Sequence, residues 1–122
     1  MLFRSTPRFV QRAIAKAIED TASNTGMTLT VAFDYGSRAE IVDAARLVVA
    51  SGRPFSVDAM NRSLYDPEMP TVDVLVRTSG EKRVSNFLLW QSAGAPIHFT
   101  ENTWPDFSEA DVDAALAAAR AA

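Results

Sequence analysis

The residues of this 122-residue chain that are best suited to chemistry stand together between positions 77 and 86. Two arginines, Arg77 and Arg83, flank a Ser-Gly turn, and Ser85 follows closely. An arginine side chain presents a planar fork of N–H donors that fits two phosphate oxygens. Serine hydroxyls and the free amides of a glycine-containing turn can complete such a cradle. The segment therefore indicates a site for an anion, and diphosphate is a sensible ligand.

The same arginines have a second, purely structural interpretation. Arg77 and Arg83 could pair with Glu81, with Asp73 or with the C-terminal helix as surface ion pairs. Exposed pairs of this kind contribute only about 0 to 1 kcal/mol to stability. Spacing alone leaves the two interpretations about equally open.

Composition excludes several other kinds of chemistry. The chain has no cysteine and one histidine, which argues against a disulfide framework, a thiolate metal site and a His-rich metal site. It contains no Walker phosphate loop, no His-Glu-x-x-His helix and no Gly-x-Ser-x-Gly elbow. The net charge is -3 and the ten arginines and two lysines are scattered, so we expect no nucleic-acid partner. No apolar run is long enough to span a membrane, and the start lacks a signal-peptide core.

The elements that would position Arg77 form a predicted parallel sheet. Residues 28–33 and 72–76 are short, mostly apolar and rich in β-branched side chains, as buried strands are. The helical pattern between them is long enough for a crossover, and residues 97–100 form a third predicted strand. Ligands of open parallel sheets bind beyond the carboxyl ends of the strands, where Arg77 lies. We therefore expect an α/β fold, with a parallel sheet flanked by helices.

Five helices are predicted around this sheet. The first runs from Pro7, with Thr6 as its N-cap, to about residue 24, and the second covers residues 38–50 and is closed by Gly52. A shorter helix follows Ser56 through residue 64, and a short buried helix is expected at 86–92. The last covers 108–121, where Ser108 and Asp111 resemble a capping box.

Three ordered blocks resemble the cis-prenyltransferase (undecaprenyl diphosphate synthase) family: residues 31–41, 77–91 and 99–107. The resemblance extends from the first helix to Phe107 and lies in the C-terminal half of the family's domain. We therefore expect residues 1–122 to form a single, incomplete cis-prenyltransferase domain. Apolar residues after the arginine block could line a prenyl-chain tunnel, but core packing is favoured for most of them: Phe87, Leu88, Leu89, Trp90, Phe99, Trp104 and Phe107.

The resemblance implies an activity, substrates and a cofactor. Family members condense isopentenyl diphosphate with an allylic diphosphate, using Mg²⁺, to make polyprenyl diphosphates. By resemblance, Arg77, Arg83 and Ser85 bind the isopentenyl diphosphate, whereas catalytic residues are left unassigned. The expected protein is cytoplasmic and forms homo- or hetero-oligomers, with peripheral membrane contact through its lipid product.

Departures from the family pattern predict that the chain does not act alone. The N-terminal Asp-Gly-Asn-Gly-Arg block, which holds the allylic diphosphate, is absent, and the family's magnesium-binding Glu falls at Pro96, which cannot ligate a metal. The last residues are Arg120-Ala-Ala in place of the family's common Arg-x-Gly segment. Asp34 and Ser37 replace a usual Asn and Gly, and Lys82 stands where the family often has His. We expect a chain that is inactive or weakly active unless a missing half or partner is supplied.

Two other functions stay open at this point. One is a non-catalytic accessory subunit of a heteromeric cis-prenyltransferase, which the proline at position 96 favours and the intact Arg77, Arg83 and Ser85 set opposes. The other is a diphosphate-binding or structural module with no role in chain elongation. Neither the length of a product nor the identity of a partner can be inferred from the sequence.

Overall fold

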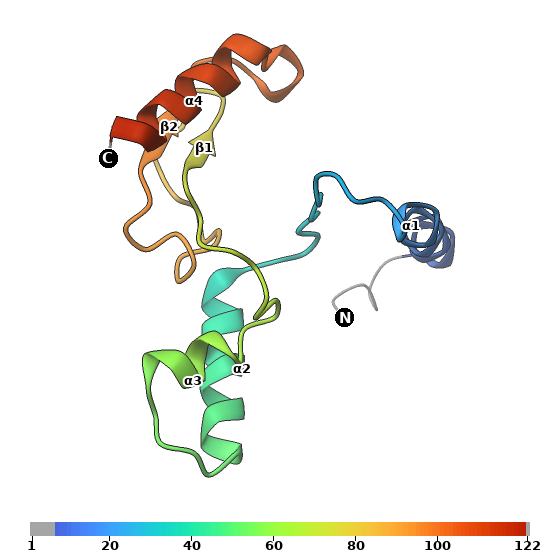
Figure 1. Ribbon diagram of the computed structural model, residues 1–122, viewed down its shortest axis with the longest axis vertical. Coiled ribbons are helices and arrows are strands. Elements are labelled where there is room, and N and C mark those ends of the chain that lie inside the picture. The colour runs from blue at the N-terminus through green and yellow to red at the C-terminus, as the bar shows by residue number, and fades with distance from the viewer. Residues whose placement is uncertain (1–6, 122) are drawn as a thin grey trace. The chain divides into compact units, whose positions relative to one another are not determined.

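The computed structural model describes residues 7–121 (Figure 1), and the chain divides into two compact units, Met1–Tyr35 and Gly36–Ala122. The larger unit is an α/β arrangement with a parallel sheet and flanking helices, as predicted. That residues 1–122 form one incomplete domain stays a prediction.

The first unit contains helix α1, Arg8–Thr21, which confirms the first predicted helix. The proposed cap Thr6 lies outside the described residues. The apolar side of α1 stays open, because Phe9 is 73% exposed and Ile18 is 63% exposed. An ion pair between Lys16 and Asp20, 2.9 Å apart one turn along the helix, lies on its surface.

The predicted strand at residues 28–33 is wrong. No residue of this segment is in a strand, and its apolar side chains lie in solvent, with Leu29 77% and Val31 69% exposed. A strand exists only where a neighbouring strand takes up its amides and carbonyls, and no described segment pairs with 28–33. Residues 28–33 thus have the composition of a buried strand but are in no strand of the structure.

Helices α2, Ser37–Ala50, and α3, Val57–Asn61, lie side by side and form the core of the second unit (Figure 1). Both predicted helices are confirmed, although α3 ends three residues before Leu64. The predicted cap is also confirmed, because the Ser56 Oγ accepts a hydrogen bond from the Ala59 amide at 3.1 Å. The core consists of residues from both helices and the turn after α3: Ala44, Val48, Ala59, Met60 and Leu64.

The sheet has two parallel strands, β1, Leu75–Arg77, and β2, Ile97–Phe99. Leu75 pairs with Ile97 and Arg77 pairs with Phe99, so the carboxyl ends of both strands lie at the same edge. Both strands were predicted, each within a few residues of its observed bounds. The expected crossover from residues 28–33 is absent from the described chain, and β1 and β2 are instead joined by residues 78–96.

The short helix predicted at 86–92 is wrong, because this part of the connection forms a series of turns. Asn86 and Leu88 have positive φ angles of 62° and 45°, which no right-handed helix contains. The Leu89 amide donates to the Ser37 Oγ at 3.0 Å rather than to a carbonyl one turn earlier. Bonds to α2 therefore replace those of a local helix.

Helix α4, Glu109–Ala121, follows a single 3₁₀ turn, Trp104–Asp106, and contacts β2 (Figure 1). The capping pair is confirmed, because the Asp111 carboxylate accepts from the Ser108 amide at 2.9 Å. The expectation of a core position is wrong for Trp104, which is 73% exposed and stacks on Phe107 with ring centroids 5.6 Å apart. Trp90 does pack against the core.

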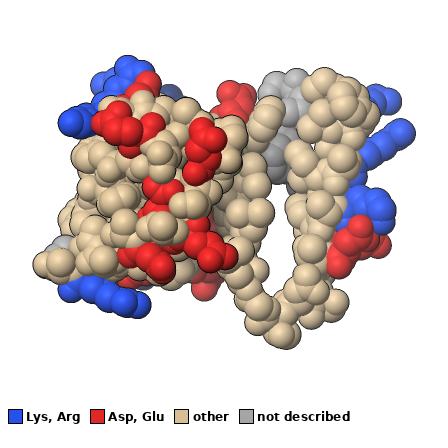
Figure 2. Space-filling model, turned by 90° about the horizontal axis from the view of Figure 1, so that it is seen from above, with Lys and Arg blue, Asp and Glu red and all other residues tan. Residues whose placement is uncertain are grey.

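Charged side chains are distributed unevenly over the surface. On the face seen in Figure 2, Asp and Glu gather over the middle of one part of the chain, with Lys and Arg at its margins. None of the helices in residues 7–121 is both long enough and apolar enough to cross a membrane.

Candidate functional site

The candidate site is the loop that leaves β1 at Arg77. Hydrogen bonds to the segment after β2 hold its first half in place. The Ser79 amide donates to the Asn102 carbonyl at 2.8 Å and the Gly80 amide to the Thr100 carbonyl at 3.0 Å. The loop is thus built on the carboxyl ends of both strands, where parallel sheets place their ligand sites.

The turn at Ser79 and Gly80 requires an unusual backbone. Both residues have positive φ angles, 64° and 66°, in the region that glycine favours. At Gly80 a Cβ atom would also collide with the carboxylate of Glu101. Gly80 therefore suits this position chiefly through its backbone conformation, since the Glu101 carboxylate is the end of a flexible side chain that can move aside.

The structure brings Arg77, Arg83 and Ser85 into one cluster around Glu81. Arg83 binds Glu81 with two donors, Nε to Oε2 at 3.1 Å and Nη2 to Oε1 at 2.9 Å. The Nη2 of Arg77 also binds Glu81 and lies 3.4 Å from the Ser85 Oγ. The predicted residues thus lie together, and the ion pairs with Glu81 that the sequence left open are formed.

The opposite charges of Glu81 and the two arginines shift the pKa values within this cluster. Hydrogen bonds from Arg83, followed by its positive charge, lower the pKa of Glu81 below its ordinary value of 4.5, and Arg77 adds to this shift. Reciprocally, the hydrogen bond to Glu81, followed by the negative charge of Glu81, raises the pKa of Arg83 above its ordinary value. At neutral pH the cluster therefore has two positive charges and one negative charge.

The donors of the two arginines are not all used within the cluster. The Nε of Arg77 is buried and finds no hydrogen-bond partner among the described residues, although the rest of its guanidinium reaches Glu81 and Ser85. The Arg83 side chain is 71% exposed, so a ligand from solvent can reach it. A group with several oxygens that displaced Glu81 would find two guanidinium forks and a hydroxyl, which is the chemistry of a diphosphate site.

A buried carboxylate, which the sequence analysis did not single out, holds the segment behind this loop. Glu40 on α2 is 1% exposed and accepts from the Tyr65 amide at 3.0 Å and from the Gln91 Nε2 at 2.9 Å. The spacing of residues on α2 could have indicated this burial. Glu40 lies on the same helix face as Ala44 and Val48, which are both core residues. An acidic residue on an apolar face indicates a buried polar contact.

The position that resemblance assigns to a magnesium ligand carries no metal-binding group. Pro96 lies directly before β2, and its carbonyl accepts from the Leu75 amide at 2.9 Å as part of the sheet. Among residues 7–121, no group of three or more His, Cys, Asp or Glu side chains could hold a metal ion. The described residues therefore do not fit a magnesium site.

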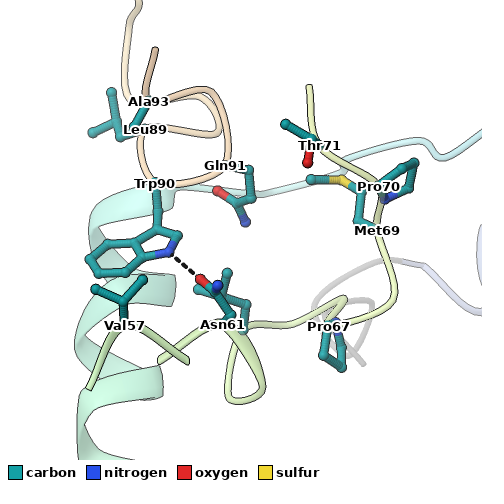
Figure 3. Close-up of a pocket in the computed structure, with 11 residues that line it drawn as sticks. Val57, Asn61, Pro67, Met69, Pro70, Thr71, Leu89, Trp90, Gln91 and Ala93 are labelled. Carbon is teal, nitrogen blue, oxygen red and sulfur yellow. Dashed lines mark hydrogen bonds between the residues drawn. The ribbon is translucent and has the colours of Figure 1, made fainter. Parts of the chain in front are cut away.

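A separate cavity of about 480 Å³ lies beside α3 (Figure 3). The Trp90 indole forms part of its wall and donates from Nε1 to the Asn61 Oδ1 at 2.8 Å. The remaining lining comes from α3, residues 64–71 and residues 89–93, and includes none of Arg77, Arg83 and Ser85. The cavity is thus distinct from the arginine cluster.

The fold and the site together define an α/β protein in which a loop at the carboxyl edge of a parallel sheet carries two arginines paired with one glutamate. A family model described as putative undecaprenyl diphosphate synthase matches residues 3–120. The chain therefore belongs to this family of cis-prenyltransferases.

Individual relatives agree with this assignment. The isoprenyl transferase of Rickettsia sibirica is 48% identical over 108 residues, which cover 88% of this chain and 48% of the relative. That of Fusobacterium nucleatum is 42% identical, over 92% of this chain and 49% of the relative. Among solved structures, the chain is similar to the crystal structure of lavandulyl diphosphate synthase from Lavandula x intermedia in complex with dimethylallyl diphosphate. The match has a TM-score of 0.88 and 36% sequence identity, and it covers 99% of this chain and 55% of the synthase chain. The chain thus spans about half the length of its relatives.

Proposed function

We propose that this chain supplies the isopentenyl diphosphate site of a cis-prenyltransferase whose allylic diphosphate site lies on another stretch of polypeptide. The proposal rests on one observation: a single loop at the carboxyl edge of the sheet brings together Arg77, Arg83 and Ser85. In this account Glu81 occupies the anion site until the diphosphate takes over its two arginines.

The bound diphosphate would orient the rest of the substrate. Two guanidinium groups neutralise the diphosphate and fix its position, so that the alkene stands beside the ionising carbon of the allylic diphosphate. A carbon–carbon bond forms, the carbon–oxygen bond of the allylic diphosphate breaks, and inorganic diphosphate and one proton are released. The contribution of this chain is binding and orientation.

The other half of the reaction needs groups from elsewhere. Prenyl diphosphate synthases are generally metal-dependent, and the described residues do not fit a magnesium site, so the ligands for Mg²⁺ would come from outside residues 7–121. Exposed apolar side chains support contact with further polypeptide, among them Leu29 and Val31 in the first unit and Val49 on α2, which is 72% exposed. The partner would be a second protein chain or a further segment of the same one.

A second candidate function is a non-catalytic accessory subunit. Pro96 favours it, because a proline with its carbonyl bound to Leu75 replaces the carboxylate expected by resemblance. Such a subunit would assemble with a catalytic chain and have no need of its own diphosphate affinity. Retention of the Arg77, Arg83 and Ser85 cluster favours the first proposal.

The test is incorporation of labelled isopentenyl diphosphate with farnesyl diphosphate and Mg²⁺, measured for the purified chain alone and with candidate partner chains. The proposal predicts incorporation only with a partner, and its loss when this chain carries Arg83→Ala. Incorporation that needs this chain but is insensitive to Arg83→Ala would support the accessory subunit instead. Incorporation by the chain alone would contradict the assignment of the allylic site to other polypeptide.

A further inference from the structure

The start of helix α2 has no cap of its own. Its N-cap residue is Gly36, which has no side chain, so the first amides of the helix need acceptors from elsewhere. The Ser37 amide donates to the Asn86 carbonyl at 3.0 Å, and the Arg38 amide donates to the Asn86 Oδ1 at 2.8 Å. A residue 48 positions further along the chain therefore caps this helix.

A third hydrogen bond joins the same two segments. The Leu89 amide donates to the Oγ of Ser37, which is fully buried. The approach is close, because a Cβ atom on Gly36 would lie 2.9 Å from the Asn86 Nδ2. Residues 86 to 89 are thus attached to the first turn of α2 by three hydrogen bonds.

This attachment lies next to the arginine cluster. Ser85 directly precedes Asn86, and both residues have the left-handed backbone, with φ angles of 53° and 62°. Asparagine adopts this conformation more readily than most residues, whereas serine keeps it only where surrounding contacts hold the backbone, and here the adjacent Asn86 makes such contacts. The conformation sets the direction of the Ser85 hydroxyl, whose Oγ lies 3.4 Å from the Arg77 Nη2.

We propose that Asn86 is a positioning residue for diphosphate binding: by capping helix α2 it fixes the backbone at Ser85 and so holds the hydroxyl beside Arg77. The inference rests on the proposed function, because it assigns Asn86 a role at that same site. Asn86 itself need not touch the diphosphate. Ser37 supports it by taking up the Leu89 amide.

Two substitutions separate the parts of this role. Asn86→Ala removes the side-chain cap and makes the positive φ angle unfavourable, whereas Asn86→Gly removes the cap and tolerates the angle. Ser56→Ala is the matched control, because it removes the same kind of cap from α3 in the same unit. Titration of each purified chain with inorganic pyrophosphate measures affinity, and amide hydrogen exchange at Arg38 and Leu89 measures the attachment.

We expect Asn86→Ala to weaken pyrophosphate binding about tenfold, equivalent to ~1.4 kcal/mol, and Asn86→Gly to weaken it less. Exchange at Arg38 should accelerate in both variants, and Ser56→Ala should bind as the wild type does. Equal affinity for Asn86→Ala and Ser56→Ala, beside a wild-type chain that binds, would overturn the positioning role and leave the proposed function intact. Absence of binding by the wild-type chain would overturn the proposed function, and the positioning role with it.

Discussion

Glu81 is the residue that joins the two arginines of the candidate site. Its carboxylate accepts hydrogen bonds from Nε and Nη2 of the exposed Arg83 and from Nη2 of Arg77, so in the proposed site a diphosphate would compete with it for both arginines. Because Arg83 lowers the pKa of Glu81, the pair contributes to stability above pH 4.5, and the contribution is lost as pH falls through the lowered value. At neutral pH the competition is fully present.

Replacement of Glu81 by glutamine should therefore strengthen diphosphate binding. Glu81→Gln removes the competing charge and leaves both arginines in place, so we expect affinity for isopentenyl diphosphate to rise about three- to fivefold at pH 7. Glu19→Gln, which removes the same charge from α1, serves as the control in the same calorimetric titration. A loss of affinity in Glu81→Gln would mean that Glu81 orients the arginines and does not compete with the ligand.

Among the secondary-structure elements, helix α4 is connected to the candidate site through Asp111. Its carboxylate accepts from the Ser108 amide and from the Asn102 Nδ2 at 2.8 Å, and the carbonyl of Asn102 in turn accepts from Ser79 in the arginine loop. The hydrogen bonds from Ser108 are the main cause of a pKa for Asp111 below its ordinary value of 3.8. The cap thus stabilises both the helix and the segment that supports the loop.

Asp111→Ala should lower the unfolding temperature at pH 7, and the difference from the wild type should shrink at low pH. A carboxylate with a lowered pKa contributes stability above its ordinary pKa, here 3.8, and loses it as pH falls through the lowered value. Circular dichroism melts at pH 7 and below pH 3 measure this. Asp113→Ala, at an exposed site on the same helix, should change little. A difference that stayed constant with pH would contradict the role of the charge.

Helices were predictable here because their signals are local. Ser56, Gly52 and the pair of Ser108 and Asp111 mark helix ends within a few residues, and the structure contains these ends. The prediction of a strand at 28–33 failed, because a strand needs a neighbouring strand to pair with and no described segment pairs with these residues. The turns at 86–92 depend on a cap that joins residues 48 positions apart, which sequence spacing cannot show.

The candidate site was also predictable only as far as its signals are local. Arg77, Arg83 and Ser85 could be placed together because all three follow one strand closely. The choice between a free anion site and ion pairs could not be made, since it depends on side-chain conformations. The structure shows the ion pairs with Glu81 and leaves the Nε of Arg77 without a partner among the described residues, and anion binding by the cluster stays a prediction.

At the scale of the whole molecule, the chain spans about half of its relatives and exposes apolar surface. Met27 is 89% exposed, and Leu29 and Val31 continue the apolar row along the segment without a strand partner. Apolar side chains gathered in an extended segment promote association with other chains. We therefore propose that residues 27–33 form part of the contact with the partner polypeptide.

Val31→Lys should reduce self-association of the isolated chain and weaken assembly with a partner. A lysine adds charge where an apolar side chain is exposed, whereas Thr30→Lys adds the same charge at a neighbouring polar residue. Sedimentation velocity of both variants measures the distribution of species. A wild-type chain that stays monomeric at all concentrations and never assembles with a partner would contradict this contact.

The central claim is that this chain binds isopentenyl diphosphate through the loop after β1, and calorimetric titration of the purified chain with that ligand tests it most directly. Arg83→Ala is the informative variant, and Arg46→Ala is its control, because Arg46 is an exposed arginine paired with Asp43 on α2. We predict saturable binding by the wild type and by Arg46→Ala, and at least about a tenfold loss in Arg83→Ala with an unchanged circular dichroism spectrum. Equal affinity in all three chains, or no binding by the wild type, would contradict the claim.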